Sequence, residues 1–217
     1  MRDTGVKNVV AIRMGINEIP TRNKRFKKFV RSVFFFGYLS PHKGVSYLIR
    51  SFKKISKEFP DSRLLIYGPT NPIHDAEKLY KKELLKLIHE LKLEKNVDFT
   101  EDYTPRDKIP TIKSQIAVFP YAKTYSAGQS EALLDTISSG KAVIVTRVRG
   151  LYESVEDGKN GFVVEPEDPE QLSAAIRKLF SNPRLVKKME EENLKIAERL
   201  NWKNIAIETL SLYKKLI

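Results

Sequence analysis

The stretch Tyr125-Ser-Ala-Gly-Gln-Ser-Glu-Ala-Leu-Leu-Asp135-Thr-Ile-Ser-Ser-Gly140-Lys-Ala-Val-Ile-Val-Thr146 contains a small polar loop, a helix and an apolar strand in that order. The loop is rich in Gly and Ser, so its backbone amides can approach a ligand closely. The helix directs its positive end back at the loop, where an anion is favoured. Asp135 lies about one turn into this helix. The stretch therefore predicts a site for a phosphorylated ligand that carries hydroxyl groups.

Apolar strand patterns alternate with helix patterns along the rest of the chain. The segments that we predict as strands are 33–37, 63–68, 96–99, 115–120, 142–146 and 161–164. Strands this short and apolar, joined by helices, indicate a parallel sheet that is covered on both sides. The predicted fold is therefore α/β, with a doubly wound, Rossmann-like sheet of six strands in the order 3-2-1-4-5-6.

Helix patterns fill the intervals between these strands and the last third of the chain. Helical spacing of apolar residues predicts helices near 45–59 and 76–91, and shorter ones near 109–112 and 150–155. Asp168 is the predicted N-cap of a further helix, with Pro169 at its first position and Gln171 completing a capping box. A helix near 183–199 follows. The last helix places apolar side chains on one face, namely Trp202, Ile205, Ala206, Leu210, Tyr213 and Leu216.

The strand order predicts where a ligand would bind. In a doubly wound sheet the site lies beyond the carboxyl ends of the first and fourth strands, because the winding direction reverses between them. The turn after the first strand reads Gly37-Tyr-Leu-Ser-Pro-His-Lys43-Gly44, and the loop after the fourth covers residues 120–130. We therefore expect Lys43 to face the loop that precedes Asp135 across one crevice.

Composition places the chain among ordinary globular proteins. Its 217 residues, 41% of them hydrophobic, are enough to bury a core. The net charge of +12 favours anionic partners, although a charged surface typical of a heat-adapted protein also accounts for it. The chain has no cysteine, so disulfides and thiolate metal sites are excluded. No signal peptide or membrane span is evident, and we expect a cytoplasmic protein. Peripheral contact with anionic lipid stays open for the basic segment 22–31.

Several functional classes are disfavoured by missing motifs. The turn after the first strand lacks the Gly-x-Gly-x-x-Gly pattern that a nicotinamide cofactor requires. His42, His74 and His89 lack the spacing of metal ligands, so we expect no metal. Binding of nucleic acid through charge alone is disfavoured, because neither a helix-turn-helix signal nor an aromatic basic groove is visible.

Taken together, these motifs resemble the C-terminal, donor-binding domain of retaining glycosyltransferases with the GT-B fold, the glycosyl transferases group 1 family. The fragments occur in the family's order and spacing. They are Gly37-Tyr-Leu-Ser-Pro-His-Lys43-Gly44, Tyr67-Gly68-Pro69, Ala127 through Gly140, Arg149-Gly150-Leu-Tyr-Glu153, Asp157-Gly-Lys-Asn-Gly161 and Pro166-Glu-Asp168.

The resemblance implies that the ligand is a nucleotide-diphosphate sugar and that no metal or other cofactor takes part. Lys43 would hold the diphosphate and act as the catalytic residue, and Asp135 would bond the ribose hydroxyls. Amides around Gln129, Ser130 and Glu131 would cradle phosphate and sugar. The other implied substrate-binding residues are Gly37, Tyr38, Gly44, Gly68 and Gly128. The sugar would be transferred with retention, while cations and amide dipoles stabilise charge on the departing diphosphate.

Three positions depart from the family's pattern. Tyr38 replaces the arginine that would hold the diphosphate, Ala127 replaces a glutamate that would contact the sugar, and Arg149 replaces a glycine. Arg149 would bring a positive charge back to the crevice, whereas Glu131 is expected to face a different direction from residue 127. These departures keep a second interpretation open, in which the chain is a non-catalytic interaction protein on the same fold.

The resemblance also predicts a domain organisation. Residues 1–32 would be a linker or N-terminal extension, 33–200 the donor-binding domain and 201–217 a C-terminal helix. The family's acceptor-binding domain has no counterpart in this sequence, so we expect this chain alone to be inactive, because donor and acceptor must be held together. The apolar face of the last helix would pack on its own domain, on a partner that supplies the acceptor-binding domain, or on a second copy in a homodimer.

Overall fold

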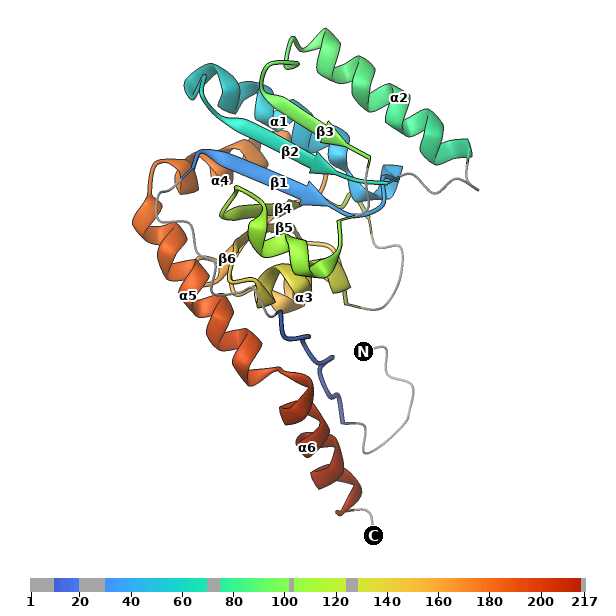
Figure 1. The fold of residues 1–217 in the computed structure, drawn as a ribbon, viewed down its shortest axis with the longest axis vertical. Helices are drawn as coiled ribbons and strands as arrows, with labels where there is room; N and C mark the ends of the chain where they lie inside the picture. Colours follow the sequence, from blue (N-terminus) through green and yellow to red (C-terminus); the bar gives the residue numbers. More distant parts are fainter. Residues whose placement is uncertain (1–9, 20–29, 70–74, 102–103, 124–128, 216–217) are drawn as a thin grey trace.

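Six parallel strands form a sheet in the order β3-β2-β1-β4-β5-β6 in the computed structural model (Figure 1). The structure describes residues 10–19, 30–69, 75–101, 104–123 and 129–215, without the side chains of residues 75 and 77. The strands are β1 (Ser32–Phe36), β2 (Arg63–Tyr67), β3 (Val97–Thr100), β4 (Ile116–Phe119), β5 (Ala142–Thr146) and β6 (Gly161–Val164). The predicted α/β fold and its strand order are confirmed.

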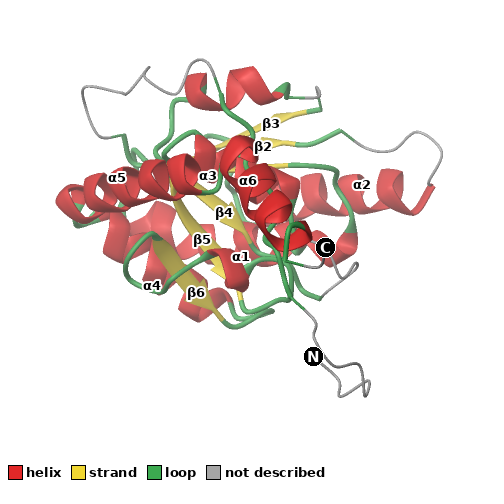
Figure 2. Ribbon diagram, turned by 90° about the horizontal axis from the view of Figure 1, so that it is seen from below, coloured by secondary structure: helices red, strands yellow, loops and turns green. Residues whose placement is uncertain are grey.

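Helices connect the strands and cover the sheet (Figures 1 and 2). The α-helices are α1 (Val45–Glu58), α2 (Asp75–Glu90), α3 (Glu131–Ser138), α4 (Pro169–Phe180), α5 (Pro183–Arg199) and α6 (Trp202–Tyr213). The short 3-10 helices are η1 (Pro41–Lys43), η2 (Arg106–Thr111) and η3 (Tyr152–Ser154). Helix α1 packs against α2 and α4, whereas α3 packs against α5 and η2. Right-handed crossovers that run in opposite directions from the centre place α1 and α3 on opposite faces of the sheet.

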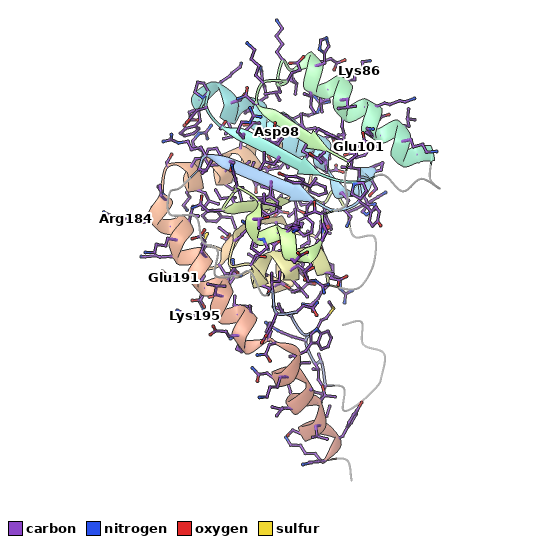
Figure 3. The ribbon with its side chains drawn as sticks, viewed as in Figure 1. Lys86, Asp98, Glu101, Arg184, Glu191 and Lys195 are labelled. Atoms are coloured by element: carbon purple, nitrogen blue, oxygen red, sulfur yellow. The ribbon has the colours of Figure 1, made fainter. Side chains whose placement is uncertain are left out.

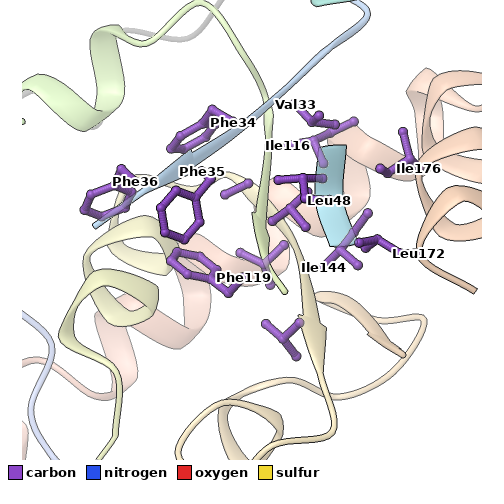
Figure 4. Close-up of a cluster of buried hydrophobic side chains, with 14 of the residues drawn as sticks. Val33, Phe34, Phe35, Phe36, Leu48, Ile116, Phe119, Ile144, Leu172 and Ile176 are labelled. Carbon is purple, nitrogen blue, oxygen red and sulfur yellow. The ribbon is translucent and has the colours of Figure 1, made fainter. Parts of the chain in front are cut away.

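The core is formed by strands that are apolar on both faces, as expected for a covered parallel sheet. Every residue of β1 and of β4 is buried. The rings of Phe34, Phe35, Phe36 and Phe119 gather at the centre of the sheet (Figure 4). Phe36 and Phe119 meet edge to face, with ring centroids 6.0 Å apart, a favourable geometry for aromatic pairs. This packing fixes the ends of β1 and β4 relative to each other.

The start of α4 follows the prediction in one respect and differs in another. Asp168 caps the helix, because its Oδ1 accepts hydrogen bonds from the amides of Glu170 (2.9 Å) and Gln171 (3.0 Å). The predicted capping box is wrong. The Oε1 of Gln171 accepts a hydrogen bond from the amide of Glu165 (3.1 Å), since the left-handed turn at Glu167 (φ 59°) folds the preceding loop back onto the helix.

The N-terminal segment 10–19 packs on the sheet domain. Ile16 and Ile19 are buried, each with 1% exposure. The amide of Ile16 donates to the carbonyl oxygen of Leu200 (2.7 Å), and the Ser138 hydroxyl donates to the carbonyl oxygen of Asn17 (2.6 Å). The described part of the predicted linker is therefore packed against α3 and the end of α5.

Helix α6 projects away from the sheet beyond α5 (Figure 1). Ile205 is buried, but four large side chains of α6 are at least half exposed, namely Trp202, Ile207, Leu210 and Tyr213. The Trp202 indole N–H donates to the Oδ1 of Asn17 (3.0 Å). Within the part of the chain that the structure describes, most of the apolar surface of α6 is thus not packed on its own domain.

Charged side chains cover the outer surfaces of the helices. Lys86 on α2 and Arg184, Glu191 and Lys195 on α5 point outward (Figure 3). Exposed ion pairs such as Lys86–Glu90 (3.7 Å) and Lys195–Glu192 (3.4 Å) contribute little stability individually. None of the helices in the described ranges is long and apolar enough to cross a membrane.

Candidate functional site

The turn after β1 and the loop after β4 meet directly at the carboxyl edge of the sheet. The amide of Ala122 donates to the carbonyl oxygen of His42 (2.9 Å). Gly44 adopts a left-handed conformation (φ 67°), and a Cβ at this position would lie 1.9 Å from the carbonyl oxygen of Pro120. Only glycine allows this approach. The turn after β1 and the loop after β4 are therefore in direct contact where the sheet reverses its winding, and Lys43 lies at that point.

Two adjoining cavities open at this edge. The cationic chamber, of about 300 Å³, is lined by Lys43, Arg149 and the start of α3. The second chamber, of about 380 Å³, is called the apolar chamber for its walls of Phe36, Tyr67 and Ile109, and its lining also includes Arg106, Glu131 and Asp135. The two chambers share a boundary formed by Gly37, Tyr38, Glu131 and Ala132. One elongated ligand can therefore occupy both chambers.

Lys43 is a half-buried cation in the wall of the cationic chamber. Its Nζ lies 3.9 Å from the centroid of the Tyr121 ring, a distance that allows a cation–π interaction. The Tyr121 hydroxyl is 3.3 Å from the Oγ of Ser130 at the start of α3. Tyr121 thus links the lysine to the helix terminus, and both features favour an anion in this chamber.

The start of α3 differs from the prediction at Ser130. Its amide donates to the carbonyl oxygen of Gly150 (3.1 Å), so it is not available to phosphate in this structure. Its Oγ accepts from the amide of Leu133 (3.4 Å) and caps the helix. Helix geometry leaves the amides of Glu131 and Ala132 without an intrahelical acceptor. These two residues border both chambers, so they replace Ser130 as the candidate anion donors.

The side chain of Gln129 has a supporting position. Its Oε1 accepts from the amide of Met14 (3.2 Å), and its Nε2 donates to the Oγ of Ser154 (3.2 Å). The N-terminal segment and η3 are thereby tied to the loop before α3. Gln129 also lines the cationic chamber.

Asp135 lies in the wall of the apolar chamber, with a side chain that is only 8% exposed. Arg106 in η2 donates from Nε to its Oδ2 (2.9 Å) and pairs through Nη2 with Glu131. Burial raises the pKa of Asp135, and the Arg106 guanidinium opposes this rise. Sequence reasoning missed Arg106, because no spacing rule connects it to a residue 29 positions away.

The remaining predicted residues divide into lining, supporting and undescribed positions. Gly37 and Tyr38 line both chambers, and Tyr38 is 54% exposed. Gly44 and Gly68 act as supports, since a Cβ at Gly68 would lie 2.7 Å from the Leu39 side chain and 2.9 Å from the Gly37 oxygen. The positions that lie outside the described residues are Ala127, Gly128 and His74.

Two charged residues, Arg149 and Glu131, lie at the chambers, and only Arg149 departs from the family's pattern. Arg149 is an exposed residue between the buried side chains of Val148 and Leu151, and it lines the cationic chamber. Glu131 lines both chambers, although its direction relative to residue 127 falls outside what the structure describes. Among the described residues, no cluster of three or more His, Asp or Glu side chains could hold a metal ion.

The fold and the two chambers define a Rossmann-like α/β protein with a ligand crevice at the point where its sheet reverses direction. The family model described as glycosyl transferases group 1 matches residues 19–196. The chain belongs to this family, which confirms the predicted resemblance. An uncharacterized glycosyltransferase of Methanocaldococcus jannaschii is 28% identical over 207 residues, which are 93% of this chain and 49% of the relative. The chain therefore spans about half the length of that relative.

Solved structures share the fold of this chain. Anabaena HepE, solved in complex with UDP, has a TM-score of 0.75 at 21% identity, over 86% of this chain and 49% of that one. The C-terminal domain of a glycosyl transferase group 1 family protein from Francisella tularensis has a TM-score of 0.68 at 23% identity, over 86% of this chain and 94% of that one. This chain thus has the fold of the matched part of these structures.

Proposed function

We propose that this chain binds a nucleotide-diphosphate sugar and serves as the donor-binding part of a retaining glycosyltransferase. The observation that carries the proposal is the pair of adjoining chambers at the reversal point of the sheet. One is apolar with a buried carboxylate, and the other is cationic beside a helix N-terminus. The family assignment supports the same activity.

The two chambers match the two chemical halves of such a donor. The nucleoside would lie in the apolar chamber between Phe36, Tyr67 and Ile109, where apolar side chains can pack on a base. Its ribose would face Asp135. The diphosphate would cross the shared boundary toward Lys43, and the sugar would lie farther into the cationic chamber, near Arg149.

Catalysis in this proposal is electrostatic. Negative charge develops on the diphosphate as the bond to the sugar breaks, and fixed positive groups stabilise it. In this chain, the positive groups proposed to stabilise that charge are Lys43, Arg149 and the amides of Glu131 and Ala132, which border the cationic chamber. Arg149 would supply the second positive charge that Tyr38 does not. No metal is required for this step.

Transfer would need an acceptor held next to the donor. We propose that a separate domain or partner chain supplies this half, with the exposed apolar side chains of α6 as part of the contact. Uridine is the first base to test, because the similar Anabaena structure is a complex with UDP.

Thermal denaturation with UDP, GDP or ADP at millimolar concentration tests donor binding. We expect at least one of them to raise the melting temperature, and Lys43→Ala to abolish the rise, because the ammonium is a main attraction for the diphosphate. Lys57→Ala is the matched control, since Lys57 is an exposed residue at the far end of the next helix, α1. It should leave the rise unchanged. No rise with any of the three nucleotides would reject the proposal.

One observation favours the second interpretation, a non-catalytic protein on the same fold. Tyr38, an uncharged residue, lines both chambers where the family's pattern has an arginine, so the diphosphate would meet one cation fewer. Sugar transfer after addition of an acceptor-domain protein would reject this interpretation. Binding of nucleotide without any transfer to a range of acceptors would support it.

A further inference from the structure

We propose that Arg106 is a positioning residue that sets the selectivity of this site for ribose, by fixing the Asp135 carboxylate toward the ligand. This inference rests on the proposed function, since it concerns the nucleoside end of the same ligand. It gives a role to a charged residue of η2, the element that already contributes Ile109 to the apolar chamber.

The contacts of Arg106 carry the inference. Its Nε lies 2.9 Å from Oδ2 and 2.8 Å from Oδ1 of Asp135, and its Nη2 pairs with Glu131. Glu131 and Asp135 are four residues apart on α3, so they lie on the same face of the helix. One guanidinium thus bridges two carboxylates across one helical turn. Its planar, rigid fork restricts how either carboxylate can turn.

The Asp135 carboxylate is prepared to accept further hydrogen bonds. Its Oδ1 is buried beside the Arg106 guanidinium, and the side chain of Asn17 also faces the carboxylate. An ionised carboxylate has about four acceptor sites, so these contacts leave it able to accept from a ligand hydroxyl. The residue lines the apolar chamber, from which such a hydroxyl would come.

Charge explains why Arg106 is needed. A carboxylate as buried as that of Asp135 tends to become protonated, and a protonated carboxyl is a weaker acceptor. Arg106 supplies the opposing positive charge, while its own side chain is 39% exposed at the chamber wall. Arg106 therefore keeps Asp135 charged and oriented, and Asp135 contacts the ribose.

The chemistry of the recognised group follows from this arrangement. A fixed, ionised carboxylate accepts from hydroxyl donors, and the two adjacent ribose hydroxyls of a nucleotide provide such donors. Loss of the 2′ hydroxyl should then weaken binding. Selectivity against 2′-deoxynucleotides is the property that depends on Arg106.

The test measures the affinities of the full chain for a nucleoside diphosphate and for its 2′-deoxy form by titration calorimetry. The base is whichever of uracil, guanine or adenine gives the tightest diphosphate. We expect the wild type to favour the ribose form about tenfold, the effect of one hydrogen bond to a charged group. Arg106→Gln should reduce this ratio to about twofold or less, because without Arg106 the Asp135 carboxylate no longer makes that hydrogen bond to the ribose. Asp135→Asn should do the same.

Matched controls separate positioning from stability. Lys108→Gln changes an exposed cation of the same 3-10 helix that pairs with its neighbour Asp107, and it should keep the wild-type ratio. Arg106→Lys retains the charge without the fork and should give an intermediate ratio. Inorganic pyrophosphate lacks ribose, so its affinity should be the same in the wild type and in Arg106→Gln. A purely structural role would lower the melting temperature and leave the ribose ratio unchanged.

The outcomes distinguish this inference from the proposed function. A wild type that binds UDP, GDP or ADP, together with an Arg106→Gln variant of unchanged ratio, overturns the role of Arg106 and leaves the proposed function standing. Equal weakening of pyrophosphate and nucleotide in Arg106→Gln also overturns it. A wild type that binds none of the three diphosphates rejects the proposed function itself, and this inference with it.

Discussion

Lys141 is a buried cation next to the first residue of β5. Its side chain lies in the core, where Nζ donates to the carbonyl oxygens of Ile112 (3.1 Å) and Ser114 (2.6 Å). These carbonyls precede β4, so the lysine satisfies polar groups that would otherwise be buried without partners. Burial lowers the pKa of Lys141 to about 8 from its ordinary 10.5.

The depressed pKa of Lys141 predicts a pH dependence of stability. Below pH 8 the ammonium is charged in the folded and the unfolded chain, and its burial cost is present in full. Between pH 8 and 10.5 the unfolded chain binds more protons, so the free energy of unfolding rises with pH. The rise amounts to about 3 kcal/mol. Urea denaturation of the wild type and of Lys141→Met across this range measures it.

The variant isolates Lys141 from other groups that titrate in the same range. Loss of hydrogen bonds to the two carbonyls lowers the stability of Lys141→Met at every pH, but it does not alter the slope. We therefore expect the difference between the two proteins to grow in favour of the wild type as pH rises. Parallel curves would show that Lys141 keeps an ordinary pKa.

Gly44 is a second residue whose substitution should change the free energy of unfolding by a measurable amount. Gly44→Ala places a Cβ 1.9 Å from the Pro120 oxygen, in a backbone conformation that already disfavours alanine. We expect a loss of about 2–4 kcal/mol in the free energy of unfolding, more than left-handed strain alone, which costs about 1–2 kcal/mol. Gly158→Ala is the matched control, because Gly158 has φ 78° and a Cβ added there would meet no atom within 4 Å. Equal losses would mean that the loops do not meet as described.

At the scale of elements, α3 shows how neighbours fix the start of a helix. The Ser130 amide is held by the carbonyl of Gly150, and Gln129 is held by Met14 and Ser154. These contacts join the N-terminal segment, η3 and the turn after β5 to one helix terminus. Sequence patterns place the helix correctly, but they do not show which amides remain available to a ligand.

Helix α6 allows a prediction at the scale of elements. A Cβ at Gly15 would lie 2.4 Å from the Trp202 ring, so Gly15→Ala should push the indole away from the N-terminal segment. Trp202 is the single tryptophan of the chain and therefore reports on this contact alone. We expect its emission to shift to longer wavelength and its quenching by acrylamide to increase, with unchanged circular dichroism. Gly158→Ala should leave the emission unchanged. An unaltered spectrum in Gly15→Ala would refute the contact.

For the whole molecule, hydrophobic patterning was sufficient to predict the sheet. The six apolar runs that alternate with helix patterns predicted the strand order, and this order predicted the edge where the chambers open. Hydrophobic patterning could not predict the ion pair between Arg106 and Asp135. It depends on how η2 packs against α3, and this packing results from tertiary contacts that no local periodicity encodes.

The pairing of β1 with β4 has a mechanical consequence. It joins only Val33 to Ile116 and Phe34 to Ala117, whereas β1 pairs with β2 over its full length. This central seam separates the strands that support the apolar chamber from those that support most of the cationic chamber. A ligand bound across the shared boundary would contact both halves of the molecule. It would resist their separation at the β1–β4 pairing, where the fewest residues of the sheet are paired.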